Sequence, residues 1–195
     1  MAQPSAREQL MLELINRARI NPQADFNAYL TSYSAPASGN ADINSALTFF
    51  RVNGAVLLAQ INALTPVAPV AWNNALADAA TAHSQVMINT DLQTHQGPGE
   101  ADLGVRTTAA GYSGFSSLGE NVFAFTESIL QGHAGFMVDW GNTTTGIQTP
   151  PGHRINILGA AFKEVGLSVL TESNPATSVG PLVVTQDFGA RFGAS

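Results

Sequence analysis

The order in which helical and strand-like patterns follow one another limits the folds that this chain can adopt. Helical segments come first, a strand-like segment lies near the middle, another helix follows, and two strand-like segments close the chain. This order is typical of an α+β domain in which helices cover an antiparallel sheet. The main predicted elements are helices at 6–19, 72–88 and 128–140 and strands at 119–125, 164–170 and 181–189.

The clearest helical pattern lies in the segment WNNALADAATAHSQVMINTD. Its apolar positions recur at the spacing of an α-helix, and Asn73 or Asn74 is suited to cap the first turn. The first helix of the chain has Ser5 as its predicted cap. It should end at Asn21-Pro22, because the residue before a proline avoids the helical region.

The helices near the N-terminus are predicted to form an extension of a single domain. A short helix is expected at 24–32, and the stretch 42–63 is apolar and mostly helical in character, with Gly54 suggesting a break into two pieces. We therefore divide the chain into an N-terminal helical extension, 1–66, packed on the same domain, and a core, 67–195.

Between the predicted central helix and strand, the stretch 89–118 is polar and rich in glycine. We expect a long ordered loop with little regular structure there, and loops of this kind are often functional. Asp91, Glu100 and Asp102 lie within it, but they lack the alternating spacing of a calcium-binding loop. We expect these three carboxylates to be solvated.

The composition is that of one domain with a substantial core. A chain of 195 residues with 45% hydrophobic residues should bury roughly 70% of the surface that its unfolded form exposes. The chain has no cysteine, which excludes disulfide bonds and thiolate metal sites. The absence of cysteine does not decide the cellular compartment.

The charge pattern disfavours two classes of partner. The formal net charge is −6, and the eight lysines and arginines form no basic run, so nucleic acids and anionic membrane surfaces are both disfavoured. No stretch reaches the roughly 20 consecutive apolar residues that a membrane-spanning helix requires. The first residues show no signal-peptide pattern, so the chain is either intracellular or a mature segment with a new start methionine.

The four histidines of the chain have different surroundings in the sequence. His83 lies on the apolar stripe of the predicted 72–88 helix, where a hydrogen-bonded core histidine is expected. His133 lies within the predicted 128–140 helix and is expected to be partly exposed. His95 and His153 lie in segments bounded by glycine and proline, which is where binding residues concentrate.

Several short motifs occur in a definite order: LELINRAR, VAWNNALADAATAHSQVM, LQTH, LGENVFA, PPGHRINIL, FKEVGLSVL and TQDFG. In these motifs, and in their separation, the chain resembles the CAP superfamily, also known as SCP-domain proteins. This superfamily comprises the cysteine-rich secretory proteins, antigen 5 and the pathogenesis-related class 1 proteins. The chain is most similar to the bacterial, cysteine-free branch, over roughly residues 70–190.

The resemblance implies an α-β-α sandwich with a central antiparallel sheet and a cleft lined by two histidines and two acidic residues. The matching positions are His95, Glu120 of LGENV and His153 of PPGHRINIL. The second acid matches Asp139, three residues after Phe136, where the family usually has glutamate. The resemblance further implies a secreted or periplasmic protein, which we expect to be a monomer.

A cleft with these residues suits a divalent cation. Two imidazoles, at His95 and His153, are metal ligands, and the two carboxylates can fix each ring from outside the metal shell. Zinc suits two nitrogen ligands best, ahead of calcium or magnesium. With only two strong ligands, the affinity should be micromolar or weaker.

Three functions remain open for such a chain. The first is a secreted binding module whose cleft takes a divalent cation or a small ligand, including a lipid or peptide. The apolar segment 45–58 could add a lipid-accepting surface, although burial in the core is the expected fate of its residues. The second is a metal-dependent hydrolase acting on peptides or cell-envelope material, with Glu120 as base. The third is a surface adhesion or interaction domain in which the four residues only brace the loops.

Overall fold

The structure of the chain, a computed structural model, describes residues 3–193. Within them the chain forms eight helices and one sheet of four strands. The helices are α1 (Ala6–Ile20), α2 (Pro22–Asn27), α3 (Ala41–Phe49), α4 (Gly54–Asn62), α5 (Asn74–Thr90), α6 (Leu103–Ala109), α7 (Ile129–Val138) and α8 (Gly152–Ile157). The strands are β1 (Ala71–Trp72), β2 (Phe115–Thr126), β3 (Glu164–Thr171) and β4 (Leu182–Arg191).

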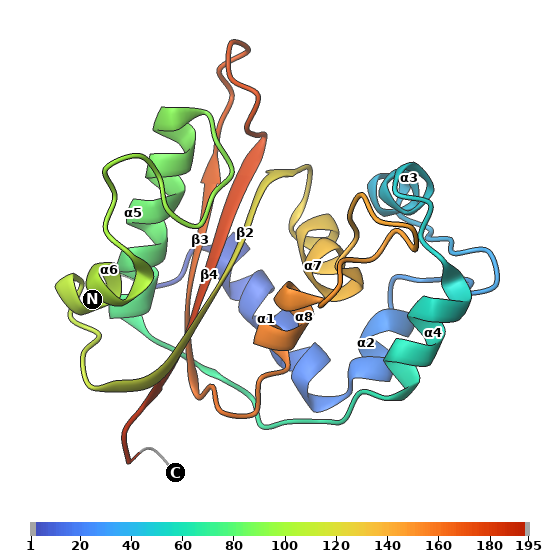
Figure 1. Cartoon of the computed structure of the whole chain (residues 1–195), viewed down its shortest axis with the longest axis horizontal. Helices are drawn as coiled ribbons and strands as arrows, with labels where there is room; N and C mark the ends of the chain where they lie inside the picture. The colour runs from blue at the N-terminus through green and yellow to red at the C-terminus, as the bar shows by residue number, and fades with distance from the viewer. Residues whose placement is uncertain (1–2, 194–195) are drawn as a thin grey trace.

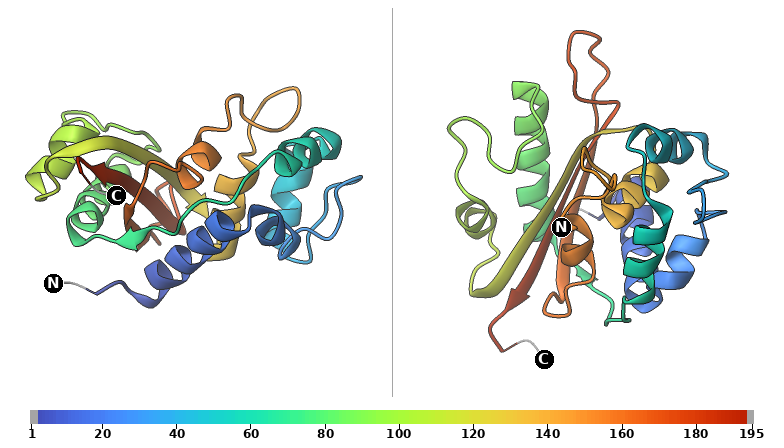
Figure 2. Two further views of the ribbon diagram at one scale, coloured as in Figure 1. Left: turned by 90° about the horizontal axis from the view of Figure 1, so that it is seen from below. Right: turned by 45° about the vertical axis from the view of Figure 1, so that its right-hand side comes forward.

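The elements form three layers, as the α-β-α sandwich requires (Figure 1). Helices α5 and α6 cover one face of the sheet, while α1, α7 and α8 lie on the other (Figures 1 and 2). The strand order is β1-β3-β4-β2, which places β2 at an edge. Strands β2, β4 and β3 pair antiparallel, as predicted, and only the two-residue β1 pairs parallel to β3.

The main hydrophobic core lies between the sheet and the helices that include α1 and α7. Met11 of α1, Phe136 of α7 and Phe188 of β4 are at most 1% exposed there. Ile43 of α3 and Leu57 of α4 belong to the same cluster and are fully buried. The N-terminal helices therefore share the core of the sandwich. The division of the chain at residue 66 stays a prediction.

The predicted helix signals near the N-terminus are confirmed. Ser5 caps α1 in a capping box with Glu8, and Asn21 ends α1 and caps α2. Gly54 is the first residue of α4, where an added Cβ would lie 1.6 Å from the backbone oxygen of Tyr33. The helix expected at 24–32 instead runs over Pro22–Asn27.

The expectation of a long irregular loop at 89–118 was wrong in its second half. Asp102 accepts a hydrogen bond from the backbone N–H of Val105 and starts α6, and β2 begins already at Phe115. Arg106 and Thr107 turn inward from α6 and are buried. A helix that buries an arginine and a threonine lacks the apolar stripe by which helices are recognised in a sequence.

The expectation for His133 was also wrong, whereas that for His83 is confirmed. His133 is fully buried, and its Nε2 lies 2.9 Å from Oδ2 of Asp25, whose Oδ1 accepts a hydrogen bond of 2.7 Å from Arg17. This chain of contacts ties α1, α2 and α7 together. His83 is a buried, hydrogen-bonded residue of α5, as predicted.

Gly166 of β3 permits the close packing of α5 on the sheet, and its replacement should be costly. An added Cβ would lie 2.0 Å from the backbone nitrogen of Ala77 and 2.1 Å from the carbonyl carbon of Leu76. We expect Gly166→Ala to lower the free energy of unfolding by about 1–3 kcal/mol or more, measured by urea denaturation. Gly39→Ala, where an added Cβ meets nothing within 4 Å, is the matched control. Equal midpoints for the two variants would contradict this packing.

Candidate functional site

The first histidine–carboxylate pair joins His95 to the edge strand. His95 lies in the loop between α5 and α6, and its Nδ1 is 2.9 Å from Oε1 of Glu120 on β2. The His95 side chain is 62% exposed, whereas that of Glu120 is 4% exposed. A buried carboxylate thus holds an exposed imidazole by one ring nitrogen. Nε2 of His95 has no hydrogen-bond partner among the described residues.

Arg106 of α6 completes the environment of Glu120. Its Nη2 pairs with Oε2 of Glu120, while its Nη1 donates a 3.0 Å hydrogen bond to the backbone oxygen of His95. Burial raises the pKa of Glu120, but the hydrogen bond to His95 and the positive charges of His83 and Arg106 outweigh it, so the pKa lies below its usual value. Glu120 is therefore ionised, and both of its oxygens are occupied.

Two further carboxylates lie close to this pair. Glu100 accepts a 2.9 Å hydrogen bond from Nδ1 of His83 and is mostly buried, so the expectation that it is solvated was wrong. Asp187 of β4 is paired in register with Glu120, and neither of its oxygens has a partner within residues 3–193. Burial and the negative charge of Glu120 raise the pKa of Asp187 well above its usual value.

The second pair joins His153 of α8 to Asp139, which ends α7. Nδ1 of His153 lies 2.7 Å from Oδ1 of Asp139, and Oδ2 of Asp139 accepts hydrogen bonds from the backbone N–H groups of His153 and Arg154. Asp139 has φ 60° and ψ 46°, a left-handed conformation that aspartate enters more readily than most residues. The shorter side chain therefore reaches its histidine directly.

The two pairs are attached to adjacent residues of β2. Asn156 of α8 donates to the backbone oxygen of Glu120 at 3.0 Å, and Asn121 donates to the backbone oxygen of His153 at 3.1 Å. Successive side chains of a strand point to opposite faces, so Glu120 faces α6 while Asn121 faces α8. The structure thus brings the four predicted residues to one edge strand as two separate pairs.

The described residues contain no cluster of three or more histidine, aspartate or glutamate side chains that could hold a metal ion. Within the same residues, no hydrogen bond or ion pair joins His95 to His153. The metal-binding potential of this site therefore rests on the unoccupied Nε2 atoms of these two histidines.

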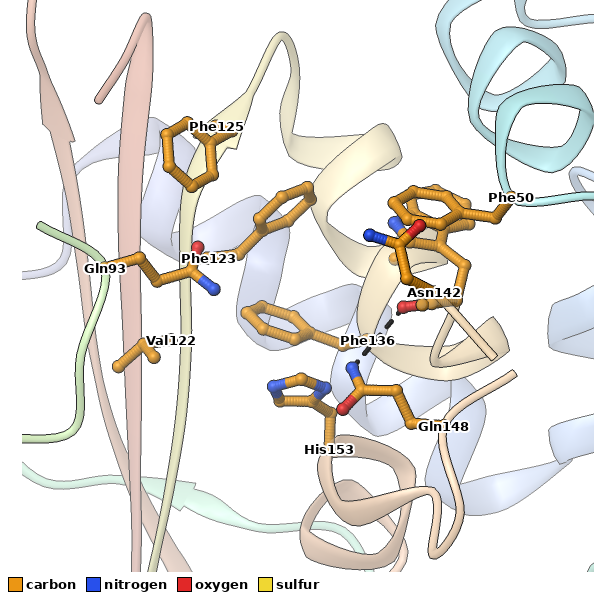
Figure 3. A pocket seen from close by; sticks show the side chains of 12 residues that line it. Phe50, Gln93, Val122, Phe123, Phe125, Phe136, Asn142, Gln148 and His153 are labelled. Atoms are coloured by element: carbon orange, nitrogen blue, oxygen red, sulfur yellow. Dashed lines mark hydrogen bonds between the residues drawn. The ribbon is translucent and has the colours of Figure 1, made fainter. Parts of the chain in front are cut away.

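A cavity of about 230 Å³ adjoins the second pair, and His153 lines it (Figure 3). Most of the wall is aromatic, and the polar side chains are amides and the imidazole. The lining residues are Phe50, Gln93, Val122, Phe123, Phe125, Gly135, Phe136, Trp140, Gly141, Asn142, Gln148 and His153. His95 is not among them.

Sequence reasoning missed several residues on which this site depends. Arg106 was overlooked because its segment was interpreted as a loop. Asn121 and Asn156 belong to the recognised motifs LGENVFA and PPGHRINIL, so their positions were visible although their roles as fasteners were not. Gln93 lies two residues before His95, and nothing in the local pattern indicates that it faces a cavity.

An α-β-α sandwich with two histidine–carboxylate pairs at its edge strand defines the class of this protein. The sequence matches the Cysteine-rich secretory protein family, CAP, over residues 12–188, and the chain belongs to that family. The resemblance in the motifs is thereby confirmed, and the absence of cysteine fits a cysteine-free branch. No curated protein matches the chain.

Three solved structures illustrate the fold. An extracellular protein with an SCP domain from Bacillus anthracis has 22% identity and a TM-score of 0.49, covering 76% of this chain. The chain spans only 41% of the length of that protein. An outer surface protein from Borrelia burgdorferi has 13% identity and a TM-score of 0.49, with 77% of this chain and 92% of that one covered. Venom allergen-like protein 4 from Schistosoma mansoni has 9% identity and a TM-score of 0.49, with 96% and 90% covered.

Removing the charge of Glu120 should destabilise the fold in a pH-dependent way. Glu120→Gln leaves the buried Arg106 without its ion-pair partner, so we expect a loss of about 3 kcal/mol at pH 7. Because the folded-state pKa of Glu120 lies below its ordinary value of 4.5, its stabilisation is present above that value and is lost as the pH falls through the folded-state pKa.

Urea denaturation of both proteins between pH 7 and pH 3 measures this difference. The gap between wild type and Glu120→Gln should narrow below about pH 4.5, the ordinary value. Glu13→Gln, on the exposed face of α1, is the control and should show no such change. A gap that stays constant with pH would contradict the assignment of Glu120 as an ionised partner of Arg106.

Proposed function

We propose that this CAP domain is a binding module whose cleft takes a small organic ligand beside His153. One observation carries the proposal: Asp139 holds Nδ1 of His153, so its Nε2 is left without a partner among the described residues in a residue that lines the cavity. Mostly aromatic cavities with a few placed polar groups are typical of small-molecule sites.

The contacts favour binding over hydrolysis. Both oxygens of Glu120 are engaged, one by His95 and one by Arg106, and its pKa lies below the usual value, so it accepts a proton poorly. The cavity lining contains no serine, threonine, cysteine or lysine as a nucleophile among the described residues. In this proposal Glu120 positions His95 and does not activate water.

A divalent cation, zinc first, is a second candidate ligand, and the orientation of both imidazoles favours it. In each pair a carboxylate occupies Nδ1, and this arrangement commonly orients a metal-binding histidine through its other nitrogen. His95 and His153 would supply two nitrogen ligands, with water completing the shell. A bound zinc ion would supply a positive charge at the mouth of the cleft.

We further propose that the domain works outside the cytoplasm, secreted or in the periplasm. Its membership of a family of secretory proteins supports this location. Within residues 3–193, no helix has both the length and the apolar character needed to cross a membrane.

A single-tryptophan variant tests the ligand site. The chain has two tryptophans, Trp72 and Trp140, and of these Trp140 lines the cavity. In the Trp72→Phe protein we expect the emission of Trp140 to change on titration with at least one of cellotetraose, chitotetraose, palmitate and tetra-alanine. The change should disappear in His153→Ala and persist in His95→Ala, which removes an imidazole outside the cavity. No change with any of the four compounds would overturn the proposal.

Zinc binding is tested separately by calorimetry. If both imidazoles bind the ion, His95→Ala and His153→Ala should each weaken zinc binding at least tenfold, about 1.4 kcal/mol. His83→Asn, a variant of a buried histidine whose ring nitrogens are both occupied, should bind zinc as wild type does. A flat titration with wild-type protein, or equal affinity in all variants, would eliminate the zinc site.

A further inference from the structure

A second cavity, of about 470 Å³, adjoins the one beside His153. The two share Phe50, Phe123, Phe125 and Trp140 in their walls, and we call their combined surface the aromatic groove. Phe49 extends the second cavity. The groove therefore runs from the imidazole of α8 to the helix α3 at the far side of the molecule from α5 (Figures 1 and 3).

The aromatic rings of the groove form open faces. Phe50 and Trp140 stack with ring planes only 10° apart and centroids 6.3 Å apart. Phe125 is 45% exposed and Phe49 is 73% exposed, which is unusual for phenylalanine in a chain with a well-filled core. The expectation that segment 45–58 is buried in the core thus holds for Leu47 and Leu57 but fails for Phe49.

Polar groups that both donate and accept hydrogen bonds accompany these rings. Oε1 of Gln93 accepts from the backbone N–H of Ala124, which leaves its NH₂ group for a ligand. The Asn142 amide has no partner within residues 3–193, and Gln148 makes only a long contact of 3.4 Å to the Trp140 backbone oxygen. With Nε2 of His153, the end of the groove offers several donors and acceptors suited to hydroxyl groups.

The charges around the groove exclude anionic ligands. Neither cavity has a lysine or arginine in its lining among the described residues, and Asp42 and Glu127 line the second cavity. The chain as a whole carries a net charge of −6. A carboxylated or phosphorylated ligand would be repelled, with no cation to bind it.

From these observations we infer that the aromatic groove binds a chain of neutral sugar units, with one unit beside His153 and the next over Phe125. This inference rests on the proposed function and names the ligand class of the same site. Sugar rings present an apolar C–H face, which stacks on aromatic rings, and a rim of hydroxyl groups, which pair with amides and imidazole. An acyl chain would leave the three amides and the imidazole without partners.

Trp140 emission in Trp72→Phe protein, with a wider set of sugars, tests this assignment. We expect cellotetraose or chitotetraose to bind at least tenfold more tightly than glucose or N-acetylglucosamine, because two subsites are filled. Tetragalacturonate, an anionic sugar chain, should bind at least tenfold more weakly than the neutral chains at low salt. Binding of tetragalacturonate as strong as that of the neutral chains would overturn the charge argument.

The same titration separates this inference from the proposed function. A His153-dependent response to palmitate or tetra-alanine, without a response to either neutral tetrasaccharide, would overturn the sugar assignment and leave the ligand site standing. No response to any compound would overturn both.

Substitutions on the exposed rings localise the second subsite. We expect Phe125→Ala to weaken tetrasaccharide binding about tenfold, as loss of an aromatic stacking contact does. Phe49→Ala should weaken binding of the tetrasaccharide but not of the monosaccharide, since Phe49 lines only the second cavity. Phe192→Ala is the control, because Phe192 is 77% exposed and lies outside both cavities. Equal effects of all three substitutions would contradict the groove.

Discussion

The ion pair between Arg106 and Glu120 is the contact on which the candidate site depends. Arg106 joins three segments at once, because its guanidinium pairs with β2 and also donates to the backbone of the loop that carries His95. Without it, Glu120 would be a buried charge without compensation, and the loop would lose its anchor to α6. The negative charge of the site is thus fixed by the fold before any ligand arrives. Asp187, its neighbour on β4, adds no second charge, because burial and Glu120 favour its neutral form.

The two histidine–carboxylate pairs look equivalent in the sequence, but their surroundings differ. His95 is 62% exposed and held by a carboxylate that is itself in an ion pair, whereas His153 is 21% exposed and lines a cavity. The backbone of Asp139, in the left-handed region, presents both oxygens to the start of α8 and fixes His153 by its side chain and its N–H together. A rigid, half-buried imidazole beside aromatic rings is the better element of a ligand site.

How far the sequence predicts this structure depends on the range of the interactions involved. Caps and periodicity act within a few residues, so the ends of α1 at Ser5 and Asn21, and the cap of α5 at Asn73, were predictable. The motifs located all four site residues. The burial of His133 depends on Asp25, 108 residues away, and no local pattern contains that partner. Helix α6 was missed for the same reason, since Arg106 is buried only because Glu120 lies opposite.

The residues that would choose a ligand lie mostly outside the motifs that identify the family. Phe50 comes from the N-terminal helical region, and Trp140, Asn142 and Gln148 come from the end of α7 and the segment that follows it, whereas LGENVFA and PPGHRINIL supply the two pairs and their fasteners. Family membership therefore predicts the frame and the imidazoles but not the wall of the groove. Because Phe50 packs on Trp140 across these two segments, the N-terminal helices shape the groove as well as the core. Ligand choice in this chain is therefore a property of how the extension meets the sandwich, and fold similarity alone cannot supply it.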